Sequence, residues 1–164
     1  MTVYIDSIPI ESKVKTEFHD ITDEVKDIAS KSKIKNGIVT VYSPHTTCVV
    51  LIQEDSHDTV DGTKFLLQDL IEAFEKITPR CERVGQYRHP GPEHIEFGKS
   101  IGDKLPWLLN THAHLRASMM SSPSQTIPLK DGELALGRFQ RIYFVDLDDT
   151  RSRKRSVHVQ ILGE

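Results

Sequence analysis

Three histidines in two separated segments are the residues of this sequence best suited to chemistry. His45 lies in Ser43-Pro44-His45-Thr46-Thr47, between two β-rich apolar runs, and His112 and His114 form an H-x-H pair further along the chain. Imidazole is the commonest neutral metal ligand and the usual proton carrier near neutral pH. On an extended segment both rings of the pair would project from the same side, because side chains alternate with period two. With His45, the pair predicts a metal triad with open positions, or a proton-transfer site.

Two more residues are candidates for the same site. Glu54 ends the strand that begins beside His45. Its carboxylate could act as a general base, orient a histidine or bind the metal, or it could simply be an acidic residue favourable near a helix N-terminus. His89 could close over the site as a lid ligand, whereas His94 is expected in an exposed loop.

Hydroxyl and guanidinium groups near the histidines suggest an anion site, because such groups suit a phosphate. The candidate residues of this kind are Thr46, Thr47, Arg116, Ser118 and Arg153. A hydroxyl-rich stretch continues after Ser118 with Ser121, Ser122 and Ser124. The alternatives are a polar loop whose serines satisfy its own backbone and, around Arg153, a solvated turn with local ion pairs.

The elements that must position these residues are strands and two principal helices. Apolar runs predict strands over 2–9, 14–20, 38–42, 47–52, 134–136, 139–147 and 156–162. Helical spacing predicts helices over 22–33, capped by Asp20 or Thr22, and over 57–77, with a short helix near 113–120. The proline- and glycine-rich residues 79–106 are expected to form a long loop. Strands joined by short turns predict a single compact α+β domain, residues 1–164, with mainly antiparallel sheet.

Composition limits the class of protein. The 164 residues are 37% hydrophobic and 27% charged, which fits one globular domain, and the formal net charge of −3 disfavours nucleic-acid binding. No apolar run approaches the roughly 20 residues that cross a membrane. The two cysteines, Cys48 and Cys81, form no CxxC pair and no signal peptide is visible. We therefore expect a cytoplasmic protein.

Several segments, in this order, resemble the YjbQ family, also called UPF0047. The strongest are His45-Thr46-Thr47 with the apolar run to Glu54, and Ala113-His114-Leu115-Arg116-Ala117-Ser118. The resemblance continues through Thr126-Ile127-Pro128-Leu129, Asp131-Gly132, Leu136-Gly137-Arg138-Phe139-Gln140 and Arg151-Ser152-Arg153. It covers nearly the whole chain, and the ordered combination is specific although each segment alone is modest.

The resemblance implies a homotrimer of α+β subunits with sites at or near the subunit contacts. It also implies a histidine-rich site that holds a divalent metal, zinc or magnesium. The activity associated with the family is thiamine phosphate synthesis, in which a pyrimidine methyl diphosphate is coupled to a thiazole phosphate and pyrophosphate is released.

The resemblance also assigns residues by position. His45 and His114 match family histidines, His112 matches a position that is often histidine, and Tyr87 with His89 matches a tyrosine-x-histidine element. Glu54 matches the glutamate of an asparagine-glutamate pair, although the preceding residue here is Gln53. Phe139 replaces the usual tryptophan beside Gln140, and Arg138 replaces a small residue.

These observations lead to one hypothesis and two alternatives. The hypothesis is a cytoplasmic trimeric transferase of the thiamine phosphate synthase kind. In it, His45, His112, His114 and His89 are the metal candidates, and His45, Glu54 and His114 the catalytic candidates. Thr46, Thr47, Arg116, Ser118, Gln140 and Arg153 are the candidates for binding a phosphorylated substrate. The alternatives are a metal-dependent phosphohydrolase that uses the same residues, and a non-catalytic trimer that binds a metal or a small anion.

Overall fold

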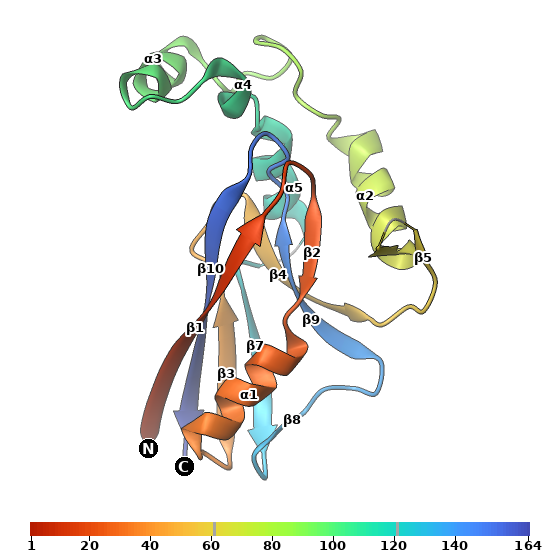
Figure 1. Ribbon diagram of the computed structural model, residues 1–164, viewed down its shortest axis with the longest axis vertical. Coiled ribbons are helices and arrows are strands. Elements are labelled where there is room, and N and C mark those ends of the chain that lie inside the picture. The colour runs from red at the N-terminus through yellow and green to blue at the C-terminus, as the bar shows by residue number, and fades with distance from the viewer. Residues whose placement is uncertain (61, 121) are drawn as a thin grey trace.

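The computed structural model describes residues 1–60, 62–120 and 122–164, and its strands form two main sheets (Figure 1). The larger sheet is antiparallel throughout, with strand order β1-β10-β3-β7-β8. Its strands are β1 Thr2–Ser12, β10 Arg153–Gly163, β3 Gly37–Tyr42, β7 Ser124–Lys130 and β8 Glu133–Leu134. The smaller sheet, also antiparallel, has the order β2-β9-β4. Its strands are β2 Glu17–Asp20, β9 Gln140–Asp146 and β4 Cys48–Glu54.

The main core lies between the two sheets. Inward-facing residues of the larger sheet, such as Val41 and Val159, meet Val50 and Phe144 of the smaller sheet. Helix α1, Thr22–Ser32, adds Val25 to this core. Side chains alternate along a strand, so the other face of the smaller sheet is available for a second core. The expected α+β class with mainly antiparallel sheet is therefore confirmed.

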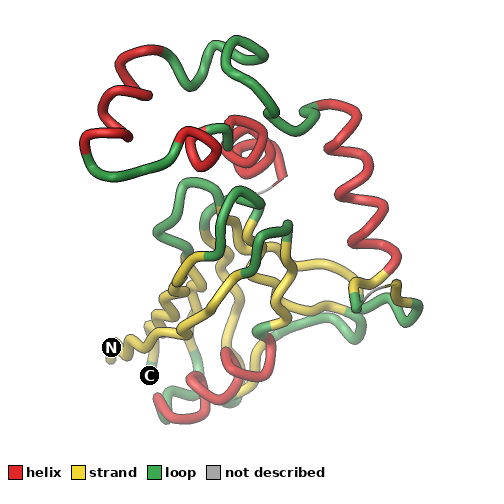
Figure 2. The backbone as a smooth tube through the Cα atoms, turned by 45° about the horizontal axis from the view of Figure 1, so that its top comes forward, coloured by secondary structure: helices red, strands yellow, loops and turns green. Residues whose placement is uncertain are grey.

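The second core joins the smaller sheet to two helices. Leu67 of α2, Phe65–Ile77, and Ala113 of α5, Thr111–Met120, pack with Tyr143 and Val145 of β9. Strand β9 is buried from both sides because it contributes alternate residues to both cores. Figures 1 and 2 show that the chain from α2 to α5 arches beyond one end of the sheets.

Two sequence-based expectations about helices are wrong. The helix predicted over 57–77 begins only at Phe65, after a hairpin of β5 Thr59–Val60 and β6 Thr63–Lys64. Residues 79–106, expected as a loop, contain α3 Pro92–Ser100 and α4 Leu105–Leu108. Both helices have a proline in their first two positions, where a missing N–H costs nothing because the amide there has no partner within the helix. These prolines start helices rather than break them.

None of the helices in 1–60, 62–120 and 122–164 combines the length and the apolar character needed to cross a bilayer.

The start of α1 is tied to the smaller sheet through Thr22. The Asp20 carboxylate accepts hydrogen bonds from the Thr22 amide (3.0 Å) and hydroxyl (2.5 Å). The same hydroxyl oxygen accepts a hydrogen bond from the buried amide of Ile142 (2.8 Å). The N-cap residue is Ile21 rather than Asp20 or Thr22, and no side chain makes a cap hydrogen bond there; Asp20 instead binds the Thr22 amide from one position earlier, while Thr22 joins the helix to β9.

We predict that Thr22→Val destabilises the fold by about 1–3 kcal/mol, because it leaves the buried Ile142 N–H without a partner. Urea denaturation followed by circular dichroism measures the loss. Thr22→Ser keeps the hydroxyl and is the matched control, expected to lose clearly less stability. Equal stability of the valine variant and the wild type would contradict this account of the Thr22 contacts.

Candidate functional site

A cavity of about 520 Å³ opens where the loop between β3 and β4 meets α5. His45 and His114 both line it, so the structure brings these two predicted residues to one place. The remaining lining residues are Tyr42, Ser43, Pro44, Thr46, Cys48, Val49, Ala117, Ser118 and Pro123. The cavity thus combines imidazole and hydroxyl groups with an apolar and aromatic wall, as small-molecule sites commonly do.

His45 is held by the neighbouring strand β10. The Ser156 backbone amide donates a hydrogen bond to His45 Nε2 at 3.0 Å. A ring nitrogen that accepts an amide N–H carries no proton, so this contact favours the neutral ring. Burial, with a further contribution from the Arg155 charge, lowers the pKa of His45 below its ordinary value. His45 is therefore a neutral imidazole near pH 7.

His114 lies on α5 and is partly buried. Burial is the largest cause that lowers the pKa of His114, and the nearby His94 and Arg153 lower it further. A backbone hydrogen bond with Thr46 and the negative charge of Asp148 act in the opposite direction without cancelling the shift. His114 is therefore also neutral near pH 7, a state in which a ring nitrogen can bind a metal ion or a proton.

Two further imidazoles lie beside His114. The His89 ring centroid is 5.6 Å from that of His114 and 4.6 Å from that of His94. Burial, together with the adjacent His94 and His114, lowers the pKa of His89. His94, expected as an exposed loop residue, is exposed but lies in the first turn of α3. The structure thus forms a cluster of His89, His94 and His114, hereafter the imidazole cluster.

The imidazole cluster suits a divalent metal by donor type and spacing. Three imidazole nitrogens on one tetrahedral zinc ion, each about 2.0–2.1 Å from it, would hold their ring centroids roughly 5 Å apart. The two separations from His89, 4.6 Å to His94 and 5.6 Å to His114, lie on either side of this distance. In the described ranges, however, no group of three or more His, Cys, Asp or Glu side chains is arranged so that it could hold a metal ion as it stands.

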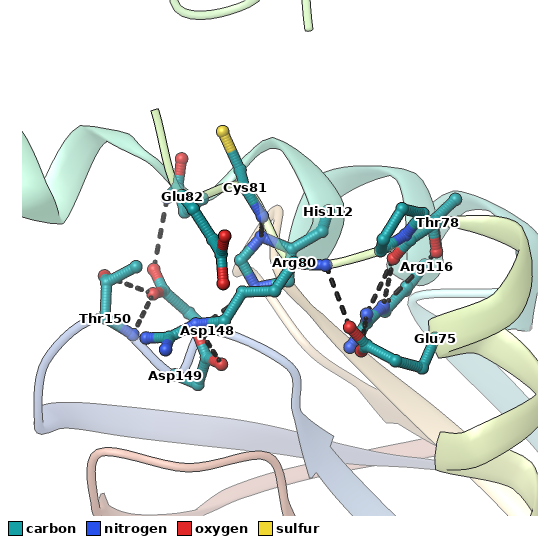
Figure 3. A network of polar contacts seen from close by, with 12 residues as sticks. Glu75, Thr78, Arg80, Cys81, Glu82, His112, Arg116, Asp148, Asp149 and Thr150 are labelled. Atoms are coloured by element: carbon teal, nitrogen blue, oxygen red, sulfur yellow. Dashed lines mark hydrogen bonds and ion pairs between the residues drawn. The ribbon is translucent and has the colours of Figure 1, made fainter. Parts of the chain in front are cut away.

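His112 does not join this cluster, and the expectation that His112 and His114 share an extended segment is wrong. Both lie on α5, where residues two apart point about 200° from each other. His112 is fully buried, its Nδ1 accepts the Cys81 amide (3.2 Å), and its Nε2 meets Asp149 Oδ1 (3.1 Å) (Figure 3). Both ring nitrogens are therefore used inside the protein, so His112 has a structural role.

Arg116 also turns away from the cavity. Its guanidinium donates to the Thr78 carbonyl and hydroxyl and pairs with Glu75, as Figure 3 shows. These groups lie at the C-terminal end of α2, where backbone carbonyls lack partners within the helix. Arg116 is 3% exposed, so it fastens α2 to α5 and has no free surface for the phosphate that the sequence suggested.

Arg153 lies near His114 but is partly committed to a carboxylate. Its Nη2 donates to Asp148 Oδ2 at 2.7 Å, and Asp148 has no exposed surface. Burial alone would raise the pKa of Asp148, but hydrogen bonds from Thr150 and the Arg153 charge outweigh it and lower that pKa. Arg153 Nε is buried without a hydrogen-bond partner, which leaves one N–H of the guanidinium unsatisfied.

The hydroxyl candidates divide between the cavity and the scaffold. Thr46 and Ser118 line the cavity, although the Ser118 hydroxyl donates to the His114 carbonyl at 3.0 Å. Thr47 is buried, and its Oγ1 accepts a hydrogen bond from Arg155. The Ser122 hydroxyl accepts the Ser124 amide in a local turn, which favours the polar-loop reading of that stretch. Ser121 lies outside the described residues.

Glu54 and Gln140 lie at the other end of the smaller sheet. They pair with each other where β4 ends and β9 begins, and both are exposed. The six residue steps from Cys48, which lines the cavity, to Glu54 span about 20 Å of strand. Gln140 Oε1 accepts the Gly137 amide in a local turn. Within the described subunit these two residues are not part of the cavity.

Sequence reasoning missed the place of His94 in the imidazole cluster. The available signal was its spacing of five residues from His89 around Pro90-Gly91-Pro92, which brings the chain back on itself. That signal is weak because the same residues also suit an ordinary exposed turn.

Comparison with known proteins gives a consistent result. The family profile described as UPF0047 protein YjbQ-like matches residues 6–164. A UPF0047 protein of Archaeoglobus fulgidus is 32% identical over 147 residues, covering 90% of this chain and 94% of that protein. The UPF0047 protein YugU of Bacillus subtilis is 26% identical over 159 residues, covering 97% and 99%.

Solved structures agree over the same length. The crystal structure of a YbjQ-like protein of unknown function from Sulfolobus solfataricus P2 matches with a TM-score of 0.74 and 30% identity, covering 99% of both chains. An uncharacterized conserved protein of the YjbQ/UPF0047 family from Clostridium acetobutylicum matches with a TM-score of 0.69 and 32% identity, covering 94% of this chain and 99% of that one.

The contrast between the two histidines of α5 can be tested directly. We predict that His112→Ala costs about 2–4 kcal/mol of unfolding free energy, because it leaves a cavity and unpaired buried polar groups. The same substitution at His114 on the same helix is the control and should cost less than about 1 kcal/mol. Chemical denaturation of the metal-free protein measures both values. A His112 variant as stable as the His114 variant would remove His112 from the scaffold.

Proposed function

Because the chain belongs to the YjbQ-like UPF0047 family, we propose that it is a transferase of the thiamine phosphate synthase kind. In this proposal the reaction takes place in the cavity beside the imidazole cluster. The observation that carries the proposal is that His114 lines one cavity with His45 and also lies in a cluster with His89 and His94.

The reaction places modest demands on proton transfer. The thiazole nitrogen forms a C–N bond to the exocyclic methylene carbon of the pyrimidine. The C–O bond to the diphosphate breaks, and its electron pair leaves with the diphosphate oxygen. No net proton is consumed, so the protein has to orient two rings, exclude water and stabilise the growing negative charge of the leaving group.

The residues around the cavity suit these tasks. His89, His94 and His114 would hold a divalent metal, which when bound would supply positive charge for the diphosphate; imidazole ligands suit zinc, whereas magnesium prefers oxygen ligands. Tyr42 and Val49 offer an aromatic and apolar surface for a heterocycle, and His45 offers its Nδ1 side to a ligand because Nε2 is occupied.

Arg153 would help to stabilise the leaving group. Its positive charge lowers the pKa of His114, and its Nε has no hydrogen-bond partner. Asp148 balances much of that charge, so we expect a supporting contribution rather than a dominant one. No role in this reaction is proposed for Arg116, Glu54 and Gln140, because their contacts in the described subunit lie away from the cavity.

We predict that the purified protein binds one divalent metal ion per subunit and forms thiamine phosphate from the two substrates. His89→Ala and His114→Ala should each lose the metal and on the order of 100-fold or more of the coupling rate. Elemental analysis and a coupling assay with pyrophosphate detection measure both effects. His57→Ala, an exposed histidine in a remote loop, is the matched control and should retain metal and rate.

Three other outcomes of this experiment would contradict the proposed transferase activity or its site. Release of inorganic phosphate from phosphorylated substrates without coupling would replace it with a phosphohydrolase. Stoichiometric metal or anion binding without turnover would replace it with a binding protein. Normal coupling by both histidine variants would remove the imidazole cluster from catalysis.

We also propose that the chain assembles as a homotrimer through the outer face of the larger sheet. Val3 (55% exposed), Ile5 (60%) and Ile38 (41%) form an apolar surface there, where strands pair in register. Tyr42 lies on the same strand as Ile38, with alternating residues between them, and lines the cavity. A neighbouring copy seated on this face would therefore also help to enclose the site.

Two free, buried cysteines, Cys48 and Cys81, support a reducing cytoplasmic location.

We predict a trimer at micromolar concentration, measured by size-exclusion chromatography with light scattering. Ile5→Asp should shift the population toward monomer, because a charge buried in an apolar contact is costly. Val14→Asp, at an equally exposed position (61%) in the loop after β1, is the control and should leave the assembly unchanged. A monomeric wild type, or a trimer indifferent to Ile5→Asp, would rule out this interface.

A further inference from the structure

His89 is held by two reciprocal contacts with one residue, Thr111. The Thr111 hydroxyl donates a hydrogen bond to the His89 backbone carbonyl, with an oxygen–oxygen distance of 2.5 Å. The same hydroxyl oxygen lies 2.9 Å from His89 Nδ1. The two residues are 22 positions apart, so this contact joins the segment before α3 to the start of α5.

The two contacts together determine which ring nitrogen carries the proton. A threonine hydroxyl has a single hydrogen and two acceptor lone pairs. Since that hydrogen is directed to the His89 carbonyl, the contact with Nδ1 is favourable only if Nδ1–H donates to the hydroxyl oxygen. In a neutral imidazole the other nitrogen then has a free lone pair. His89 Nε2 is thus the nitrogen left to face a ligand.

Thr111 is itself fixed by its neighbours in the chain. It is 6% exposed and is the first residue of α5. The preceding Asn110 donates from its side chain to Asp148 (3.2 Å), and the following His112 meets Asp149 (3.1 Å). Both contacts anchor this turn to the loop after β9. The hydroxyl therefore has a defined position from which to orient the His89 ring.

We propose that Thr111 is a positioning residue that holds His89 as the Nδ1–H tautomer and keeps Nε2 available beside His94 and His114. Groups that accept the second N–H of a ligand histidine orient the ring and increase its basicity, and their loss typically lowers metal affinity or activity by about 10–100-fold. The consequence for metal binding rests on the proposed function, whereas the tautomer of His89 does not. Thr111 touches neither substrate nor metal in this assignment.

The tautomer can be read directly in protein labelled with ¹⁵N-histidine. In the metal-free wild type at pH 7.5, long-range ¹H–¹⁵N spectra should show His89 with a protonated Nδ1 and an unprotonated Nε2. Thr111→Val removes the hydroxyl with little change in shape and should populate the Nε2–H tautomer. Thr111→Ser should restore the wild-type pattern, and His89→Ala identifies the resonance. Thr126→Val, which removes an exposed hydroxyl on β7, is the matched control and should change nothing.

Zinc titration of the same variants gives the second readout. We predict an affinity about 10–100-fold weaker for Thr111→Val than for the wild type, with recovery in Thr111→Ser. A merely structural role would lower stability without changing the His89 tautomer. If the valine variant fails to fold, the wild-type and serine spectra still test the assignment.

The possible failures are distinct. A wild-type His89 with its proton on Nε2 would overturn the inference whether or not a metal binds. An unchanged zinc affinity in a folded Thr111→Val protein would overturn the positioning role. A wild type that shows the Nδ1–H tautomer but binds no zinc and couples no substrates would overturn the proposed function and leave the Thr111 contact standing.

Discussion

Asp146, at the end of β9, has no exposed surface, so its negative charge must be balanced inside the protein. Arg155 of β10 does this with two parallel hydrogen bonds, Nε to Oδ2 at 2.7 Å and Nη2 to Oδ1 at 3.0 Å. An unpaired carboxylate at such a position would cost several kcal/mol, so the pair constrains everything attached to it. Arg155 also donates to Thr47, and the Cys48 thiol donates to Asp146. The loop that carries His45 is therefore fastened to the meeting point of both sheets.

Two carboxylates in the loop that follows β9 hold the helix on the other side of the cavity. Asp148 is paired with Arg153 and accepts from Asn110, and Asp149 is shared between Arg80 and His112. These contacts anchor the N-terminal end of α5, which presents His114. The acidic run after β9 thus serves as scaffold. His112 belongs to that scaffold because its buried ring links the acidic loop to the backbone at Cys81.

This arrangement also determines the charge of the site. His45, His89 and His114 are all partly buried, and burial is the main reason that the pKa of each is lowered. Neutral rings can approach one another without repulsion, and those of His89 and His114 keep a lone pair for a ligand, whereas the His45 Nε2 lone pair accepts the Ser156 amide. The negative charge of Asp148, which is paired with Arg153, raises the pKa of His114 without cancelling this lowering. These three imidazoles are therefore neutral, and the buried charges near them are paired with one another.

The amino-acid sequence by itself determined the α+β class and the place of His45 and His114. Alternating apolar residues fix which face of a strand is buried, and the resemblance carried by the segments around these histidines covers the whole fold. The sequence could not place His112, because residues 110–114 lack a periodic apolar pattern that distinguishes helix from strand. An i, i+2 pair shares a side only in the strand. The sequence also predicted that Glu54 lies in the same site as His45. That prediction failed because a few residues of extended strand span a long distance.

The tertiary structure alone decided which imidazoles meet. His94 lies on α3, which begins at Pro92 in a segment that otherwise looks like a loop, and Thr111 joins His89 of the same segment to α5, which carries His114. The buried carboxylates of Asp146 and Asp148 pair with Arg155 and Arg153, so both arginines help to hold the fold together. Arg153 Nε is left without a hydrogen-bond partner. Such choices depend on desolvation and on contacts between distant residues, and neither is visible in residue type or spacing.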